Sequence, residues 1–450
     1  MPEHEDTIVA ISTPPGRGGI GIIRLSGPAA RTIAEPLLKL RHPLAPAQAR
    51  FAEIIDNTGE ILDEAVVTFF ERPHSYTSED IVEIAGHGSP VLLDHLLRQC
   101  IAAGARIAEP GEFTQRAFIS GRLDLTQAEA VHDLIEATTL HQARIAAQQL
   151  GGSLSRQITP IKQQLIALIA ALEAGIDFAE DDIDLLPTNE ITTQIAEIQA
   201  PLAALEKTFA YGRIVRDGFS LAIVGRPNAG KSSLFNRLIQ RDRAIVTASP
   251  GTTRDLISER ISLEGIPVEL IDTAGLREST SEAEILGIAK SREVMAEADI
   301  VVLVLDATQS FHAEDEAAIA ALANRSFLIV INKSDLSTNF LSIQHRLNAL
   351  ETSALTGAGI PELRRAILAC LTKEAPTMEN ALLTNLRQQQ AVSTACTALV
   401  RVQHAVAATI PHEMILLDLY EALHALDTLT GATTIDDVLN LVFSQFCIGK

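Results

Sequence analysis

The chain has few cysteines for its 450 residues, and they lie far apart, at Cys100, Cys370, Cys396 and Cys447. None of them forms a C-x-x-C pair. A disulfide framework or a zinc site needs cysteines in close, regular spacing. The cysteine pattern therefore favours a reducing cytosol over a disulfide-stabilised or zinc-binding protein.

Long hydrophobic runs are also missing. The longest, at 165–172, has eight residues and ends at Glu173, whereas a membrane helix needs about 20 apolar residues. The chain begins with the acidic residues MPEHED, where a signal peptide would be basic and then apolar. We expect a cytoplasmic protein with no membrane partner.

Positive charge is in deficit, because 36 Lys and Arg stand against 57 Asp and Glu, which gives a net charge of −21. Such a balance excludes a protein that coats nucleic acid or anionic membranes non-specifically. Any RNA contact must be local or shared with a partner. With 47% hydrophobic and 21% charged residues the chain is otherwise ordinary, and its length predicts two or three domains of about 150 residues each.

The spacing of apolar residues changes along the chain and divides it into regions of different predicted structure. Short apolar runs between turns predict strands in the first region, at 8–10, 20–25, 65–70 and 81–84. Ser89 and Pro90 predict the start of a helix there. Apolar residues three or four apart predict helices from 123 to 210 and again from 383 to 446.

Between the two helical blocks, strands alternate with helical segments, and we expect these strands at 221–224, 268–271, 300–305 and 327–331. This alternation predicts a parallel sheet with crossover helices. The fold class is therefore α/β plus all-α. We expect an N-terminal α/β domain at 1–118, a helical domain at 119–215 plus 379–450, and an α/β domain at 216–378 inserted into it.

The first motif follows the strand at 221–224 and reads GRPNAGKS at 225–232. This is G-x-x-x-x-G-K-S between a strand and a helix, in which glycines let backbone N–H groups close around phosphate. Lys231 reaches the outer phosphates and Ser232 holds Mg²⁺. The predicted contacts are Asn228, Ala229, Gly230, Lys231, Ser232 and Ser233.

Three further motifs follow in the required order. Asp272, Thr273, Ala274 and Gly275 end one strand, where the aspartate orients a metal-bound water and the glycine approaches the outermost phosphate. The next strand is followed by Asn332, Lys333, Ser334 and Asp335. A carboxylate there accepts from the two N–H donors of guanine and rejects adenine. The last motif, which supplies backbone for the base carbonyl, is Ser353, Ala354 and Leu355. Four motifs in order predict a guanine-nucleotide-binding domain.

The loop that contains Thr252 and Thr253 lies between the predicted strands at 221–224 and 268–271. A threonine there completes the Mg²⁺ shell only when the γ-phosphate is present, which makes the loop a switch. Many regulatory GTPases place a glutamine after the Asp-x-x-Gly motif to orient the attacking water, but this chain has Leu276. The remaining candidates are Glu278, Glu282 and Glu284.

Sequence signatures outside these motifs are similar to one family along the whole chain. They are TPPGRGGIGIIR at 13–24, GHG at 86–88, PGEFTQRAF at 110–118 and FCIGK at 446–450. The chain resembles the MnmE (TrmE) family of tRNA modification GTPases.

The resemblance implies a first domain that binds 5-formyltetrahydrofolate and forms a homodimer, a helical bundle, and an inserted Ras-like P-loop GTPase domain. It also implies hydrolysis of GTP with Mg²⁺ and with K⁺ in place of an arginine finger. The implied role is modification of the wobble uridine of certain tRNAs, in a heterotetramer with the flavoprotein MnmG.

The resemblance further assigns residues. The implied K⁺ ligands are Asn228, Thr247, Ser249 and Thr252, and the Mg²⁺ ligands are Ser232 and Thr253. The nucleotide-contacting loop comprises Thr247, Ala248, Ser249, Pro250, Gly251, Thr252 and Thr253. Glu284 is implied as the residue that activates water, beside Lys231 and Asp272 as catalytic residues. The implied folate residues are Arg24, Glu83, Arg122 and Lys450, with Arg122 where some relatives carry lysine.

Two other functions compete with this interpretation. A ribosome-assembly or translation-type GTPase would use the same four motifs, but would be expected to add an RNA-binding module with a basic face, and neither flank shows one. A dimeric scaffold with structural GTP would not need Lys231, Asp272 and Glu284. Phosphate release in the presence of potassium distinguishes it from an enzyme.

Overall fold

The protein is seen in a computed structural model that describes residues 6–177, 186–239, 257–272, 298–336, 347–371, 382–432 and 449. The chain divides into two compact units. Unit 1 comprises Met1–His132, Leu150–Lys162 and Leu419–Lys450, and unit 2 comprises Asp133–Gln149 and Gln163–Asp418. No helix in the described ranges is both long and apolar enough to cross a membrane.

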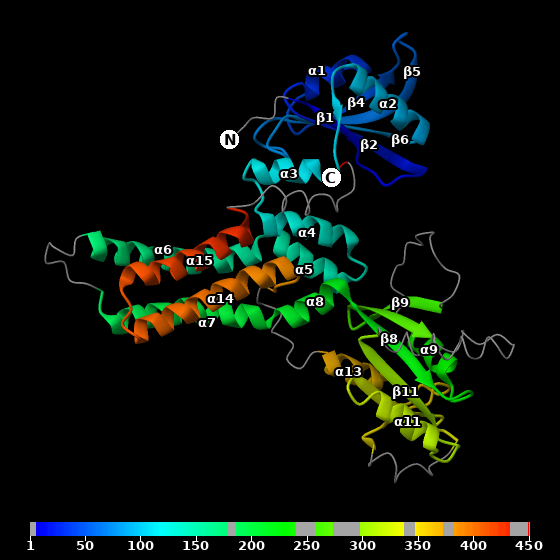
Figure 1. The fold of residues 1–450 in the computed structure, drawn as a ribbon. Helices are drawn as coiled ribbons and strands as arrows, with labels where there is room; N and C mark the ends of the chain where they lie inside the picture. The colour runs from blue at the N-terminus through cyan, green and yellow to red at the C-terminus, as the bar shows by residue number, and fades with distance from the viewer. Residues whose placement is uncertain are drawn as a thin grey trace. The chain divides into compact units, whose positions relative to one another are not determined.

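A mainly antiparallel sheet forms the centre of unit 1 (Figure 1). Within the described residues its strand order is β3-β4-β5-β6-β2-β1-β7. The strands are β1 Ile8–Ile11, β2 Gly18–Ser26, β3 Leu38–Leu40, β4 Ala49–Ile55, β5 Ile61–Phe70, β6 Ile81–Gly88 and β7 Arg106–Ile107. The four strands predicted in this region are confirmed, whereas β3, β4 and β7 were not predicted.

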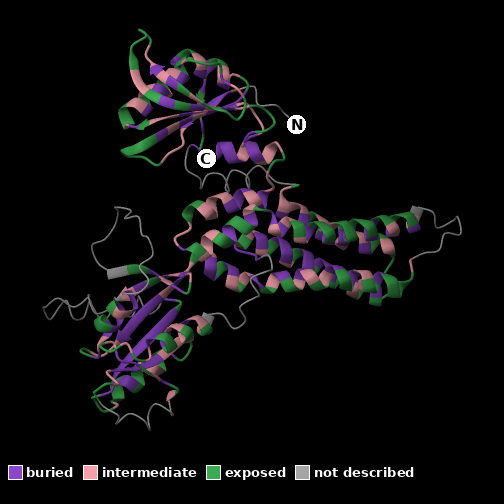
Figure 2. Ribbon diagram, turned by 180° about the vertical axis from the view of Figure 1, so that it is seen from behind, coloured by how far each residue is buried: buried purple, intermediate pink, exposed green. Residues whose placement is uncertain are grey.

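Alternation along these strands buries one face of the sheet more deeply than the other. On β2, Ile23 and Leu25 are buried in the main core, while Ile22 and Arg24 on the opposite face are half-exposed. The helices of this region are α1 Ala30–Ala34, the 3₁₀ helix η1 Glu35–Leu37, α2 Pro90–Ala102 and α3 Glu112–Ile119. Helix α2 adds Leu93 and Leu96 to the main core. Successive side chains of a strand point to opposite faces of the sheet, so buried and less buried residues alternate along the strands (Figure 2).

The remaining helices confirm the helical blocks as far as the described residues extend. They are α4 Leu125–Glu136, α5 Leu140–Leu150, α6 Ser153–Asp177, α7 Thr188–Lys207, α8 Phe209–Asp217, α14 Leu386–Ala407 and α15 His412–Thr430. In unit 2, α7 packs against α14. Helix α7 buries Ile191, Ile195, Ile198, Leu202 and Leu205, a spacing of three or four residues that puts all five on one face. Gln149 on α5 donates to the carbonyl oxygen of Leu382 at 2.8 Å, which ties the segment before α14 to the first helical block.

The sheet of unit 2 has the order β13-β12-β11-β8-β10-β9 within the described residues. Its strands are β8 Phe219–Gly225, β9 Ile257–Leu263, β10 Ile266–Asp272, β11 Ile300–Asp306, β12 Phe327–Asn332 and β13 Leu350–Glu351. All neighbouring pairs are parallel except β9 and β10. The four predicted strands, now β8, β10, β11 and β12, are parallel as expected, whereas the antiparallel β9 was not predicted. Glu264 and Gly265, with φ angles of 50° and 90°, form a two-residue turn that allows only an antiparallel pair.

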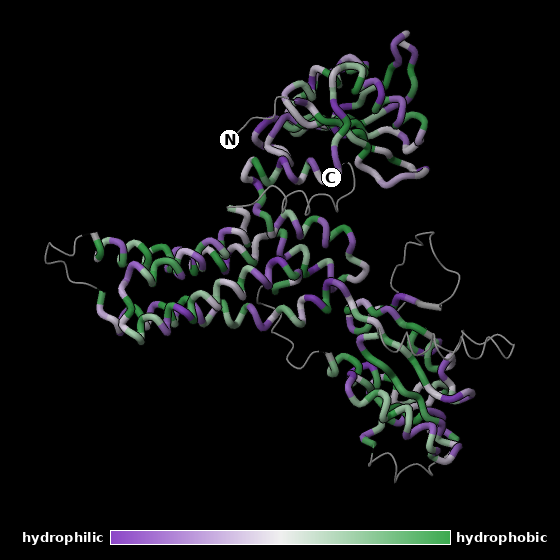
Figure 3. The backbone as a smooth tube through the Cα atoms, viewed as in Figure 1, coloured by the Kyte–Doolittle hydropathy of each residue, from purple (hydrophilic) through white to green (hydrophobic). Residues whose placement is uncertain are grey.

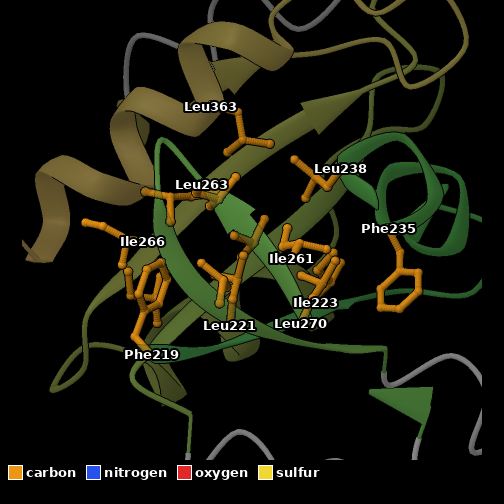
Figure 4. Packing of buried hydrophobic residues seen from close by; sticks show 14 of the residues in the cluster. Phe219, Leu221, Ile223, Phe235, Leu238, Ile261, Leu263, Ile266, Leu270 and Leu363 are labelled. Atoms are coloured by element: carbon orange, nitrogen blue, oxygen red, sulfur yellow. The ribbon is translucent and has the colours of Figure 1, made fainter. Parts of the chain in front are cut away.

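Helices cover both faces of this second sheet. They are α9 Lys231–Ile239, α11 Ala313–Ala321 and α13 Ile360–Leu371. Figure 4 shows Leu238 of α9 and Leu363 of α13 meeting Ile261 and Leu263 of β9 in one buried cluster. A second cluster, on the other face, contains Leu303 and Ile329 and packs against α11. Strand β11 is buried along its whole length, and the central strands appear continuously hydrophobic in Figure 3, as parallel strands covered on both faces require.

Helix α8 approaches the segment before α14 unusually closely at Gly212. A Cβ atom on this buried glycine would lie 2.1 Å from the carbonyl oxygen of Leu383. The approach is fixed by Thr208, whose hydroxyl accepts from the backbone N–H of Leu383 at 3.1 Å. Gly212 thus allows two segments far apart in sequence to join.

Gly212→Ala is predicted to destabilise the protein by about 1 to 3 kcal/mol, because the added methyl group overpacks a site that cannot relax cheaply. An exposed glycine in a helix would respond in the opposite direction, since alanine is the better helix former by about 1 kcal/mol. Urea unfolding of the full chain measures the change. Arg213→Ala, at the exposed neighbouring position, is the control and should shift the free energy of unfolding by less than about 0.5 kcal/mol.

Candidate functional site

The carboxyl ends of four strands meet at one edge of the second sheet. Val304 pairs with Gly225, Asp306 with Asn332, and the backbone of Asp272 with Ile223. The loops that follow these strands therefore leave the sheet side by side. In α/β sheets this edge is where ligands bind.

The loop after β8 has the backbone shape of a phosphate-binding loop. Gly225, Asn228 and Gly230 have φ angles of 148°, 63° and 88°. A Cβ atom on Gly225 would lie 2.3 Å from the carbonyl oxygen of Val304, so this position requires glycine for space as well as for conformation. The loop ends where α9 begins, which directs the helix N-terminus at its centre.

Polar side chains at the start of α9 lie where the motif predicts them. Lys231 is 9% exposed, and its ammonium group donates to the carbonyl oxygen of Arg226 at 2.8 Å, across the loop. Ser232 and Ser233 are exposed on the first turn of α9. A serine hydroxyl is an oxygen donor of the kind that Mg²⁺ prefers. Among the described residues no group of three or more His, Cys, Asp or Glu could hold a metal ion.

Asn332 holds the phosphate-binding loop and the base-binding loop together. Its side chain is 1% exposed. The amide nitrogen donates to the carbonyl oxygens of Ala229 at 3.1 Å and Gly230 at 3.4 Å, and the amide oxygen accepts from the backbone N–H of Ala354 at 3.0 Å. A Cβ atom on Gly230 would lie 2.2 Å from the same nitrogen. One buried amide therefore fixes the distance between two of the predicted contact segments.

Lys333 adds a second connection between the loops. Its ammonium group donates to the carbonyl oxygen of Asn228 and to the carboxylate of Asp306, each at 2.7 Å. Burial alone would raise the pKa of Asp306, but hydrogen bonds from Lys333 and Thr308 outweigh it and hold that pKa below its ordinary value. Asp306 is thus a charged anchor for Lys333. Asp306 was not predicted as a site residue, although an aspartate directly after a buried apolar strand is a signal for one.

The residues predicted to read the base lie on the next loops along the same edge. Asp335 is exposed in the turn after β12. Ser334 is joined to the following strand, because its backbone N–H donates to the carbonyl oxygen of Thr352 at 3.1 Å. Ser353 is fully buried, whereas Leu355 is 81% exposed. The structure therefore brings the residues of the first, third and fourth motifs together.

Several residues of the predicted site lie outside the described residues. They are Thr247, Ala248, Ser249, Pro250, Gly251, Thr252, Thr253, Thr273, Ala274, Gly275, Glu278, Glu282, Glu284 and Lys450. Leu276 and Cys447 also lie outside them. Asp272 is described only through the backbone at the end of β10.

In unit 1, Arg24 and Glu83 face each other on neighbouring strands. They are direct register partners on β2 and β6, and the Arg24 guanidinium binds the Glu83 carboxylate at 2.8 Å. Both side chains retain about a quarter of their exposure, 22% and 26%. This pair occupies the half-exposed face of the sheet.

Tyr76 lies between the predicted folate residues. The guanidinium carbons of Arg24 and Arg122 each lie 6.0 Å from the centre of its ring, and Arg122 also donates to the carbonyl oxygen of Ser75. Burial raises the pKa of the Tyr76 hydroxyl, although its hydrogen bond with Thr114 and the nearby arginines oppose that shift. Sequence reasoning missed Tyr76, since an isolated aromatic residue in a turn gives no pattern.

The C-terminal end of the chain returns to the same place. The carbonyl oxygen of Gly449 accepts from Ser12 at 3.0 Å and from Arg24 at 3.4 Å. A Cβ atom on Gly449, whose φ is 100°, would lie 2.5 Å from the carbonyl oxygen of Ile11. The residue before Lys450 is thus held beside Arg24, as a shared ligand site would require.

Fold and loops together define a P-loop nucleotide-binding protein with a guanine-type base loop. Two sequence models of known families cover most of the chain. The model described as "GTP-binding protein TrmE N-terminus" matches residues 7–122, and "MnmE helical domain" matches residues 125–447.

Curated relatives are similar along their full lengths. The "tRNA modification GTPase MnmE" of Koribacter versatilis is 57% identical, over 99% of this chain and 99% of its own. The protein of the same name from Aquifex aeolicus is 41% identical, over 99% and 100%. This chain belongs to the MnmE (TrmE) family of tRNA modification GTPases, and it is a GTP hydrolase. Family membership implies GTP as substrate and Mg²⁺ as its metal.

Solved structures match a smaller part of the chain. A variant of Aquifex aeolicus Era bound to GDP.AlF4- is 28% identical with a TM-score of 0.28, over 40% of this chain and 66% of its own. The G domain of the T. maritima FeoB transporter is 27% identical with a TM-score of 0.26, over 34% and 98%.

Asp335→Asn is predicted to weaken GTP binding by at least about 2 kcal/mol, because a charge-assisted bidentate contact becomes a mismatched donor pair. The variant should gain affinity for xanthosine triphosphate. Titration of the purified full chain measures both. Glu316→Gln removes one exposed carboxylate elsewhere in unit 2 and should leave both affinities unchanged. Wild-type GTP affinity in Asp335→Asn would contradict the assignment of base recognition.

Proposed function

We propose that the chain is a potassium-dependent GTPase that acts as a homodimer with the flavoprotein MnmG and modifies C5 of the wobble uridine in certain tRNAs, using a folate one-carbon donor. The observation that carries the proposal is the 57% identity to a tRNA modification GTPase along the whole chain. The proposed domains are 1–118 for folate and dimerisation, 119–215 plus 379–450 for the helical bundle, and 216–378 for the GTPase.

The proposed nucleotide site divides the work among its motifs. Lys231, Ser232 and the loop from Asn228 to Gly230 bind the phosphates, while Asp335 and the backbone of Ala354 and Leu355 read the base. Mg²⁺, when bound, neutralises phosphate charge and is held by Ser232 and Thr253. Asp272 and Glu284 orient the attacking water, which Leu276 cannot do.

Asn228 is well placed to supply an oxygen ligand to K⁺, with Thr247, Ser249 and Thr252 as the proposed further ligands. Its side chain is exposed at the mouth of the loop, and its backbone is held in the left-handed region by Lys333. A monovalent cation there would offset the negative charge that develops between the phosphates, as an arginine finger does elsewhere.

Hydrolysis is therefore predicted to slow about ten-fold or more when sodium replaces potassium or when Asn228 becomes glycine, while GTP still binds. Glycine is chosen because it accepts the φ of 63°, so that loss of the amide oxygen is separated from backbone strain. Asn236→Gly, at an exposed position on α9, the helix that follows the loop, is the control for loss of an asparagine side chain. Equal rates of GTP hydrolysis in sodium and in potassium would contradict the proposed potassium site.

Arg24, Glu83, Arg122 and Lys450 are the proposed folate residues, with Tyr76 now added. A carboxylate such as Glu83 can accept from the amino and ring N–H groups of a pterin, and the arginines suit the carboxylates of its glutamate tail. The ring of Tyr76 between the two guanidinium groups offers an aromatic surface of the kind on which a flat heterocycle stacks. The chemistry of this donor set fits the ligand.

The proposed homodimer has a surface that suits it. Four residues lie side by side across the half-exposed face of the unit 1 sheet, because Phe51 pairs with Val66, Val66 with Ala85, and Ala85 with Ile22. Phe51 and Val66 are 44% and 48% exposed. An apolar row of this kind, beside Arg24 and Glu83, favours association through the first domain.

Glu83→Gln and Arg24→Ala are predicted to reduce affinity for 5-formyltetrahydrofolate at least about ten-fold, because the first removes the carboxylate that accepts from the pterin N–H groups and the second removes a cation that suits the carboxylates of the ligand. Calorimetry on the full chain measures the affinity. Nucleoside analysis of tRNA from cells that carry only the variant measures the consequence, which should be loss of the modified wobble uridine while GTP hydrolysis persists.

Glu64→Gln on the neighbouring strand removes an exposed carboxylate from the same face and should leave folate binding and tRNA modification intact. Undiminished folate binding by both test variants would place the ligand elsewhere. Normal wobble uridine in cells that lack the protein altogether would contradict the proposed function itself.

A further inference from the structure

Three arginines line one cleft in unit 2, next to the loop of the fourth nucleotide motif, because Gly357 in the lining donates its backbone N–H to the carbonyl oxygen of Ser353. The cleft has a volume of about 440 Å³ and is lined by Arg237, Glu264, Thr356, Gly357, Ile360, Pro361, Arg364 and Arg365. The lining contains three guanidinium groups and one carboxylate. In a chain of net charge −21 this is a local concentration of positive charge.

Core packing fixes the two helices that carry these arginines. Leu238 of α9 and Leu363 of α13 are fully buried in the same cluster (Figure 4). Arg237 and Arg364 are their immediate neighbours in sequence and are half-exposed. Each arginine therefore lies at the rim of a rigid core contact, and the cleft keeps its shape.

Specific contacts hold the guanidinium groups in place. Arg364 donates to the carbonyl oxygen of Leu238 at 3.1 Å, which joins α13 to the end of α9. Arg237 lies against the backbone of Gly357, where a Cβ atom would come within 2.5 Å of its Nη2. Arg365 is 66% exposed and is paired with Glu362 at 2.7 Å. Guanidinium groups that are ordered in advance, as those of Arg237 and Arg364 are by these contacts, lose less entropy when they bind an anion.

The chemistry of the cleft suits phosphate. Guanidinium forks bind phosphate oxygens in a bidentate way, and the N-terminal end of α13 lies in the lining. The described residues that line the cleft include no aromatic side chain on which a base could stack. The cleft therefore suits contact with the backbone of a nucleic acid, which fixes position without reading sequence.

We propose that Arg237, Arg364 and Arg365 form a binding site for the backbone phosphates of the tRNA on which the chain acts. The inference rests on the proposed function, in which the chain works on tRNA. It also accounts for how so acidic a protein meets RNA. A small basic cleft supplies the local contact that the overall charge opposes.

The test compares full-length wild type with Arg237→Gln/Arg365→Gln and measures tRNA affinity by fluorescence anisotropy over a series of salt concentrations. Arg364 is retained because it joins the two helices. Affinity should fall about ten-fold, and the slope of log affinity against log salt should decrease by about 0.7 to 0.9 for each phosphate that the variant no longer binds. GTP hydrolysis without tRNA should be unchanged.

Arg365→Glu is a second variant at an exposed position and should weaken tRNA binding further. The control is Arg325→Gln, which removes one positive charge from another exposed part of unit 2 and should leave both affinity and salt slope unchanged. Equal thermal unfolding of all variants excludes loss of fold as the cause.

Other outcomes separate the possible errors. If the double variant binds tRNA with wild-type affinity and slope, the inference is wrong, whereas the proposed function stands. If inorganic phosphate or free GTP loses a second binding site in that variant while tRNA does not, the cleft serves free phosphate instead. If only association with the flavoprotein weakens, the cleft is a protein contact. Absence of tRNA binding by wild type, alone and with the flavoprotein, would contradict the proposed function.

Discussion

A single buried amide, that of Asn332, is the contact on which the geometry of the nucleotide site depends. It donates to the phosphate-binding loop and accepts from the base-binding loop. Since the side chain is almost completely buried, neither loop can move away without leaving a polar group unsatisfied, which costs about 1 to 3 kcal/mol. The spacing between these two loops is therefore set by the buried Asn332 amide.

The neighbouring residues strengthen the same constraint. Lys333 joins Asn228 to the buried carboxylate of Asp306, so that a charge on β11 supports the conformation of the loop after β8. Gly230 allows the close approach of the Asn332 amide, which any side chain would block. Residues at the ends of β8, β11 and β12 are thus joined by hydrogen bonds into one network. This network holds together short motifs that are widely spaced in sequence.

The sequence predicted correctly those features whose residues are adjacent in the chain. The strand before GRPNAGKS, the helix after it and the loops at Asn332 and Ser353 follow from phosphate and base chemistry, and the structure has them at one sheet edge. Strands β3 and β4 were missed because their apolar residues alternate with polar ones only over short stretches. The antiparallel β9 was missed because the Glu264 turn lies outside any motif. Tyr76 and Asp306 were missed because their partners are distant in sequence.

Carboxylates position the cations throughout this acidic chain. Glu83 holds Arg24, Asp306 holds Lys333, and Glu362 holds Arg365. Each pairing lowers the entropy that the cation loses on meeting a ligand, at the cost of part of its charge. An excess of acidic residues is thus compatible with anionic ligands, because what those ligands meet is the local arrangement of fixed cations rather than the net charge. The same principle connects the phosphates of GTP, the proposed folate and the proposed contact with tRNA.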